Sequence, residues 1–406
     1  MAVETDRRRF LALAKTAALG GAAGLLGGAI AWRSFDRDVF SLADFSRQEY
    51  LSAALSAYGE SGNYFCAAGA LAASYLNSQP WAFQVSDGQI LVFADLARWT
   101  GAADPTARQL FMSVGCAIRT IEIAAGAHGV QARTSIVLDE QAVDLKTGEL
   151  VLVAQIDLVP GAPDQEARKL SPLLASRRTN RHAHDLGHGI SETGIQWLQK
   201  AGDTDLTRLL LVPHTQRRHT EFAKLLGQAA KYRAADNAYT NDGGRWFRCL
   251  EADLLEKRDG ENLDSLGISP IYLPMWKFWR CPSPRTVADF RAEIVVERAP
   301  YSNFLGALML PERDNSMRSI VAAGRIWQEL CLIAARIPLS VHPVSALSEY
   351  FLTPGHDEAK RARASFTKDV SRMPGWKPVL AFRMGRATGD AASLPRREPD
   401  SVILTG

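Results

Sequence analysis

One stretch of the chain, from Ser74 to Trp81, combines residue types that could bind a polar, planar ligand. Asn77 and Gln79 each carry an amide that can donate and accept hydrogen bonds. Pro80 disfavours helical backbone at the residue before it, so we expect Gln79 to be extended with its amide free. Trp81 should open a buried strand. The alternative interpretation is a well-capped helix end that binds nothing.

A second stretch could hold an anion such as a phosphate. Arginine binds phosphate oxygens through two parallel N–H groups, and a neighbouring hydroxyl adds a further donor. The basic run consists of Arg177, Arg178, Thr179 and Arg181, and the C-terminal tail adds Arg396 and Arg397. A basic run is also typical of a solvated surface, and the run by itself leaves that alternative open.

The two stretches together resemble the flavin-side motifs of the nitroreductase family, in particular its Acg-like subgroup. The match consists of the Ser-x-x-Asn-x-Gln-Pro-Trp spacing in residues 74–81 and an Arg-Arg-Thr-x-Arg run in residues 177–181, where the family has Ser for Thr. The resemblance covers roughly Phe65 to the C-terminus. It implies an FMN cofactor, bound by Ser74, Asn77, Gln79, Trp81, Arg177, Arg178, Thr179, Arg181, Arg396 and Arg397.

The resemblance also implies the activity. In this family, hydride passes from NAD(P)H to the flavin N5 atom and then to a nitroaromatic, quinone or similar acceptor. The protein positions and tunes the cofactor, so no catalytic side chain is expected. The glycine-rich loop that usually approaches N5 has no clear copy here, because residues 338–343 contain two prolines, which lack N–H donors. The alternative function is therefore a flavin-binding or flavin-storage protein with little turnover. A third is a structural protein on a degenerate scaffold, which would need the arginine run to face solvent.

An internal repeat indicates how the chain is organised. Residues 115–125 can be laid on residues 324–334, with Gly115 over Gly324 and a shared apolar stripe at helical spacing. A nitroreductase protomer is about half this length and forms an intertwined dimer, so the chain resembles such a dimer fused into one monomeric polypeptide. We therefore expect an α+β fold of two tandem halves, each a mainly antiparallel sheet with flanking helices. Each half lacks one of the two motifs, so the resemblance implies one FMN.

The expected boundaries are a signal peptide at 1–31, a first half at 32–160 and a second half at 161–406. An aromatic insert at 237–284, which in the subgroup serves as a lid, could also be a satellite core. Local patterns predict helices at 41–58, 64–76, 106–128, 192–201 and 215–233. Strands are predicted at 82–85, 89–93, 134–138, 150–158, 208–212, 293–297, 304–310 and 378–383.

The N-terminus predicts export. Three arginines, Arg7 to Arg9, precede an Ala, Gly and Leu-rich stretch that ends in a small-x-small site at Ala31. This resembles a twin-arginine signal peptide, although Asp6 replaces the usual Ser or Thr. The twin-arginine export machinery would then be a partner and the periplasm the destination. An uncleaved membrane anchor is the alternative.

Other features exclude classes of function. A net charge of +3 is too small to indicate a nucleic-acid partner. His182, His184 and His188 lie in a Gly/Asp-containing loop without Cys or carboxylate spacing, so no metal site is expected. The five cysteines show no Cys-x-x-Cys pair. Cys249 and Cys281 could pair in an exported protein, but the sequence cannot give their distance.

Overall fold

Two sheets, one from each half of the chain, organise the part of the protein described by the computed structural model. That part is residues 45–404 without 188, 269–272, 274–280 and 354. The first sheet has the order β3-β4-β2-β1-β9 and the second β5-β6-β8-β7. All neighbouring pairs are antiparallel except β1 with β9. The strands are β1 Trp81–Ser86, β2 Gln89–Asp95, β3 Val130–Ile136, β4 Leu150–Pro160, β5 Arg208–Pro213, β6 Phe304–Pro311, β7 Ser340–Val344, β8 Trp376–Gly385 and β9 Ile403–Leu404.

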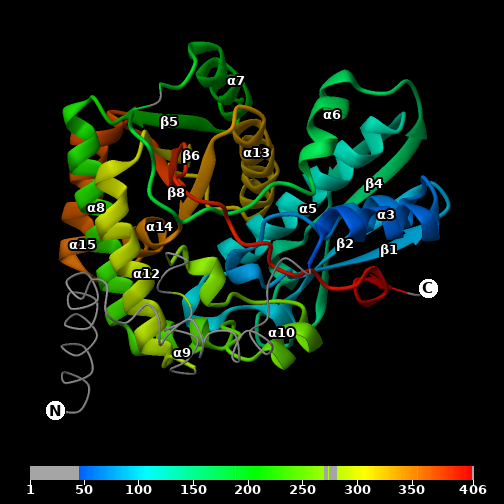
Figure 1. Ribbon diagram of the computed structural model, residues 1–406, viewed down its shortest axis with the longest axis horizontal. Helices are drawn as coiled ribbons and strands as arrows, with labels where there is room; N and C mark the ends of the chain where they lie inside the picture. Colours follow the sequence, from blue (N-terminus) through cyan, green and yellow to red (C-terminus); the bar gives the residue numbers. More distant parts are fainter. Residues whose placement is uncertain (1–44, 188, 269–272, 274–280, 354, 405–406) are drawn as a thin grey trace, which may run out of the picture. The chain divides into compact units, whose positions relative to one another are not determined.

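Helices flank both sheets (Figure 1), which confirms the expected α+β class. Helices α4 and α5 pack on the first sheet, while α8 and α14 contact the second sheet, as does α13. The helices are α3 Arg47–Tyr58, α4 Gly62–Gly69, α5 Arg108–Ala127, α6 Gln165–Leu170, α7 Glu192–Gly202, α8 Arg217–Ala235, α9 Asn237–Gly244, α10 Glu251–Lys257, α12 Pro284–Arg298, α13 Met317–Arg336, α14 Ala346–Phe351 and α15 Asp357–Ser365.

Two local predictions are wrong. The expected strand at 293–297 is the end of α12, which Ser283 caps and which carries proline in its first turn. Ala288, Ala292 and Val295 then form a buried stripe at helical spacing, and α12 packs on α8, so tertiary packing overrides the β-branched local sequence. The helix expected at 64–76 ends at Gly69, and the chain turns sharply before Trp81.

The aligned repeat corresponds to a pair of facing helices, α5 and α13, which lie side by side at the centre of Figure 1. The two aligned glycines meet where the helices approach most closely. A Cβ atom on Gly115 would overlap the carbonyl oxygen of Val321, and one on Gly324 would overlap that of Met112. The repeat therefore records a close backbone contact that only glycine permits.

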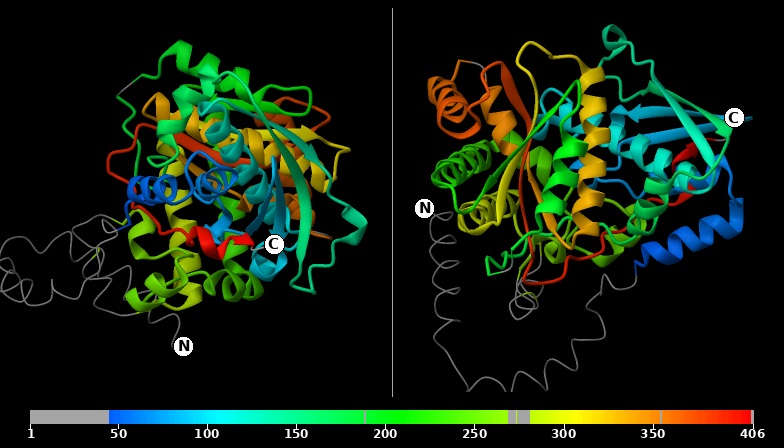
Figure 2. Two further views of the ribbon diagram at one scale, coloured as in Figure 1. Left: turned by 90° about the vertical axis from the view of Figure 1, so that its right-hand side faces the viewer. Right: turned by 90° about the horizontal axis from the view of Figure 1, so that it is seen from above.

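The C-terminal tail joins the halves. After β8 it runs back across the molecule to the first sheet, as the red segment of Figure 1 shows, and β9 pairs in parallel with β1 through Phe83 and Ile403. The tail therefore supplies a strand to the sheet of the other half. Figure 2 shows the same segment from two further directions. The halves are therefore joined through β9, a strand of the second half that completes the sheet of the first.

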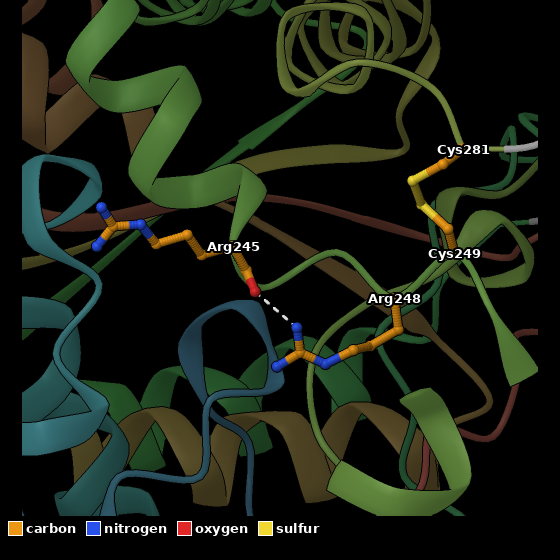
Figure 3. The surroundings of a disulfide bond; sticks show 4 residues. All are labelled: Arg245, Arg248, Cys249 and Cys281. Carbon is orange, nitrogen blue, oxygen red and sulfur yellow. Dashed lines mark hydrogen bonds between the residues drawn. A yellow bond between two sulfur atoms is a disulfide. The ribbon is translucent and has the colours of Figure 1, made fainter. Parts of the chain in front are cut away.

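A disulfide links Cys249 and Cys281, whose Cα atoms are 5.1 Å apart (Figure 3). The sequence left this pairing open. In the same segment, Arg248 donates a hydrogen bond of 2.6 Å to the carbonyl oxygen of Arg245. Cys66, Cys116 and Cys331 are free and buried.

The N-terminal arginines and the apolar stretch after them lie outside the described residues. Within the described residues, α5 alone is long and apolar enough to cross a membrane. It is mostly buried inside the protein, as expected of a core helix.

Candidate functional site

A cavity with a volume of about 130 Å³ opens where the two motifs meet. Its walls come from the first half at 73–77 and 109–116, from the second half at 177–181 and 341–345, and from the tail at 392–396. The predicted site residues that line it are Ser74, Asn77, Arg177, Arg178, Thr179, Arg181 and Arg396.

The corner that carries Asn77 is held in unusual backbone geometry. Leu76, Asn77 and Gln79 all have positive φ, between 50° and 53°, which non-glycine residues rarely adopt. Hydrogen bonds to the main chain fix this geometry. The main-chain N–H of Gln79 donates to the Ser74 hydroxyl at 3.2 Å, and the N–H of Gly260 donates to the main-chain carbonyl of Asn77 at 3.1 Å. Strain of this kind persists only where surrounding contacts determine it, and it is common at functional sites.

Gln79 differs from the prediction, since its backbone is left-handed and its amide is not free. The side chain is fully buried; its nitrogen donates to the Arg258 carbonyl at 2.8 Å, and its oxygen accepts from the Arg397 N–H at 2.9 Å. Gln79, Trp81 and Arg397 do not line the cavity. The Arg397 guanidinium instead donates to the carbonyls of Gln79, Trp81 and Ser401. These three residues therefore attach the tail to the corner.

Four arginines gather at one end of the cavity: Arg47, Arg177, Arg178 and Arg396. Arg47, Arg177 and Arg396 are at most 5 % exposed. Within the described part of the chain, none of the four pairs with a carboxylate, and the Nε atoms of those three buried arginines have no hydrogen-bond partner. Because positive charge gathers here without a carboxylate among the described residues, this cluster can serve as a cradle for an anion.

The pKa values of these groups reflect the same arrangement. Burial lowers the pKa of Arg396, and the like charges of Arg177 and Arg178 lower it further. Burial and then Arg396, Arg178 and Arg177 lower the pKa of Arg47. The pKa of Arg178 falls to about 10 through burial and the charge of Arg177. An anion bound among them would relieve this repulsion and raise these pKa values again.

Asn77 and Arg181 line the cavity, but their side chains also bind other parts of the chain. The Asn77 oxygen accepts from Arg396 at 2.5 Å, and its nitrogen donates to the Gly260 and Pro395 carbonyls at 3.0 and 3.3 Å. Its amide thus positions Arg396.

Arg181 forms an ion pair with Glu261, which also pairs with Arg291 at 2.6 Å. Burial would raise the pKa of Glu261, but Arg181 and Arg291 more than offset this and hold it below its usual value.

The rest of the cavity wall mixes polar and apolar side chains. Met112, Trp327 and Leu380 supply apolar surface together with Pro343, whose ring nitrogen carries no hydrogen. Thr179 adds a hydroxyl-bearing side chain to the wall. The site therefore combines clustered positive charge, which suits an anion, with apolar side chains that could pack against a ring.

Sequence reasoning missed three residues of the wall: Arg47, Gln109 and Glu261. Arg47 stands in the first turn of α3, where a lone arginine is ordinarily solvated, and Gln109 lies in a helix whose pattern indicates only a core. Glu261 belongs to the aromatic insert, whose role the sequence left open. No local signal identifies any of them.

Of the three histidines in this loop, His184 packs against a buried arginine, whereas His188 lies outside the described residues. Arg383 is fully buried and donates to the His342 Nδ1 atom at 2.9 Å, while its Nη1 lies 3.4 Å from the His184 Nε2 atom. Burial, with Arg383 and Arg298 nearby, lowers the pKa of His184 to about 3, so this ring is neutral. The described residues contain no cluster of three or more metal-ligating side chains.

No protein-family model and no curated protein matches this chain. Among solved structures, the FMN-dependent nitroreductase NfnB from Mycobacterium smegmatis, in complex with NADPH, is 16 % identical with a TM-score of 0.38, covering 60 % of this chain and 100 % of that one. A Bacteroides fragilis nitroreductase with bound FMN is 13 % identical with a TM-score of 0.33, covering 58 % and 98 %. A putative nitroreductase from Anabaena variabilis is 10 % identical with a TM-score of 0.39, covering 74 % and 69 %.

Proposed function

We propose that this chain binds one FMN in the cavity and acts as an exported, monomeric oxidoreductase of the nitroreductase type. NAD(P)H would be the reductant and a nitroaromatic, quinone or similar compound the acceptor. One observation carries the proposal: four arginine side chains without carboxylate partners among the described residues line one cavity together with Met112, Trp327 and Leu380. A phosphate monoester attached to a flat ring system has chemistry that suits both kinds of side chain.

The residues present fit this cofactor. The guanidinium groups of Arg47, Arg177, Arg178 and Arg396, which line the cavity, would supply positive charge and N–H donors to the phosphate. Asn77 holds the Arg396 guanidinium in place. When bound, FMN supplies hydride chemistry at its N5 atom. The chain's own contribution is to bind the phosphate, hold the ring in the slot beside Met112 and Trp327, and exclude water from it.

Export is part of the proposal and rests on two features. The first 31 residues resemble a twin-arginine signal peptide, which would be read by the corresponding export machinery. The Cys249–Cys281 disulfide is of a kind that persists in oxidising compartments such as the periplasm. Thiol titration of denatured protein from the periplasmic fraction should find three free cysteines. Five free thiols there would contradict the disulfide, and a protein confined to the cytoplasm would contradict export.

A storage function is favoured by one observation. Pro343 lines the cavity in the segment where related enzymes have a glycine-rich loop, and it has no N–H to offer a ligand. In this version the same site binds FMN but transfers little hydride. Adding NAD(P)H to the FMN-loaded protein distinguishes the enzyme from the storage protein. The reductant should bleach the yellow colour of an active enzyme, whereas a storage protein should stay yellow.

The central experiment compares FMN with riboflavin, which has the same ring but no phosphate. Titration followed by flavin fluorescence should show FMN binding at least about 100-fold more tightly, since several charge-assisted hydrogen bonds depend on the phosphate. Inorganic phosphate should compete with FMN. A protein that stays colourless after incubation with FMN, or that binds both flavins equally, would refute the proposed site.

A further inference from the structure

A buried amide of helix α5 forms part of the cavity wall. Gln109 is 4 % exposed and lines the cavity. Its Nε2 atom donates to the Glu349 Oε1 atom at 3.2 Å, a contact between the first half and α14 of the second. Among the described residues no donor contacts its Oε1 atom, and that atom is not enclosed by protein. Gln109 therefore presents a bare acceptor to the cavity.

The orientation of this amide depends on Glu349. A carboxylate can only accept, so it draws the NH₂ group of Gln109 toward itself and turns the oxygen the other way. Beside this pair, burial and then the charge of Glu349 raise the pKa of Asp104 to about 8. Burial also raises the pKa of Glu349, while Arg233 and Arg108 oppose the rise.

A ligand that covers the Gln109 Oε1 atom must offer it a donor, because a polar atom that is closed off from water without a hydrogen-bond partner is costly. The oxidised ring system of a flavin has one N–H group, at N3 of its pyrimidine ring. This reasoning rests on the proposed function, since it assumes that the ligand of the cavity is a flavin.

We propose that Gln109 accepts the N3–H of the bound flavin and that Glu349 is the positioning residue that fixes the Gln109 amide for this contact. The pair would thereby select an imide-bearing ring over one that offers no N–H at this edge. Neither residue contacts the phosphate cradle, so their effect on affinity is separable from that of the arginines.

The test uses the full exported chain without cofactor and two ligands, FMN and FMN methylated at N3. Unaltered protein should bind the methylated ligand at least tenfold more weakly, because the acceptor then loses its donor. Gln109→Met keeps the side-chain volume but removes the acceptor, so it should bind both ligands within about twofold of each other. If the preference were steric, this variant would retain it, and the proposal would be wrong.

Further arms complete the test. Glu349→Leu removes the partner that orients the amide, so the preference for FMN should fall below that of unaltered protein. Gln199→Met, a matched change on the exposed face of α7, should leave the preference intact. Equal binding of both ligands by unaltered protein, which needs no variant to fold, overturns this inference alone. Failure to bind either ligand overturns the proposed function together with it.

Discussion

Arg47 of α3 donates a hydrogen bond of 2.7 Å to the main-chain carbonyl of Arg177, 130 residues further along the chain. An arginine of the first half is thereby held against the basic run of the second. Both guanidiniums are buried beside each other without a carboxylate. The contact shows that the anion cradle is assembled from both halves, and that its positive charge is concentrated before any ligand binds.

Replacing Arg47 should separate stability from binding. Arg47→Met removes one of four mutually repelling charges, so thermal unfolding of ligand-free protein should occur at the same or a higher temperature. FMN affinity should fall by about 10- to 100-fold through loss of charge-assisted hydrogen bonds. Arg217→Met changes an exposed arginine and should alter neither quantity. Unchanged FMN affinity in Arg47→Met would place the phosphate elsewhere.

The adjacent tail arginines should behave differently. Arg396 lines the cavity, whereas Arg397 binds carbonyls of the corner and of the tail itself. Arg396→Met should therefore lower FMN affinity at least tenfold. Arg397→Met should lower the free energy of unfolding by about 1–2 kcal/mol and leave FMN affinity within about twofold. Chemical denaturation and fluorescence titration of both variants check this, and the reverse pattern would contradict the assignment.

The glycine contact between α5 and α13 should tolerate no side chain. Gly115→Ala places a Cβ atom against the Val321 carbonyl, so the helices must separate, at a cost of about 3 kcal/mol or more in unfolding free energy. Gly189→Ala is a suitable control, since a Cβ there meets nothing within 4 Å. Urea denaturation measures both. A Gly115→Ala protein as stable as the control would show that the helix pair is looser than described.

The contribution of Asp104 to the free energy of unfolding should fall as the pH rises from its unfolded-state pKa to its folded-state pKa. Burial raises its folded-state pKa from 3.8 to about 8, so between these values the folded state binds more protons than the unfolded state. The contribution of this group to unfolding free energy therefore declines with increasing pH across that window. Asp104→Asn keeps an oxygen acceptor for the Leu110 N–H, which Asp104 accepts at 2.9 Å. The free energy of unfolding of Asp104→Asn should fall less between pH 5 and 8 than that of unaltered protein. Parallel curves of unfolding free energy against pH would show that the pKa of Asp104 is not raised.

The sequence was sufficient for features that short stretches encode. The arginine run of residues 177–181, the corner of residues 74–81 and the matched Gly115 and Gly324 could all be read directly. Each depends on local spacing or on a repeat, and the resemblance that they carry led us to expect two tandem halves, each built on a sheet. The contact between α5 and α13 was not predicted, because a repeat does not say which elements touch. The boundaries of the halves and the signal peptide remain predictions from the sequence.

Tertiary structure alone decided which of these residues face the cavity. Gln79 and Arg397 carry the expected chemistry, but folding turns both toward the chain, where each satisfies the other. Arg47 and Gln109 look ordinary in sequence and acquire a role only beside Arg177 and Glu349. The physical reason is that the partners of a buried charge or amide determine its orientation and its free hydrogen-bonding groups. Here those partners lie more than a hundred residues away in the sequence.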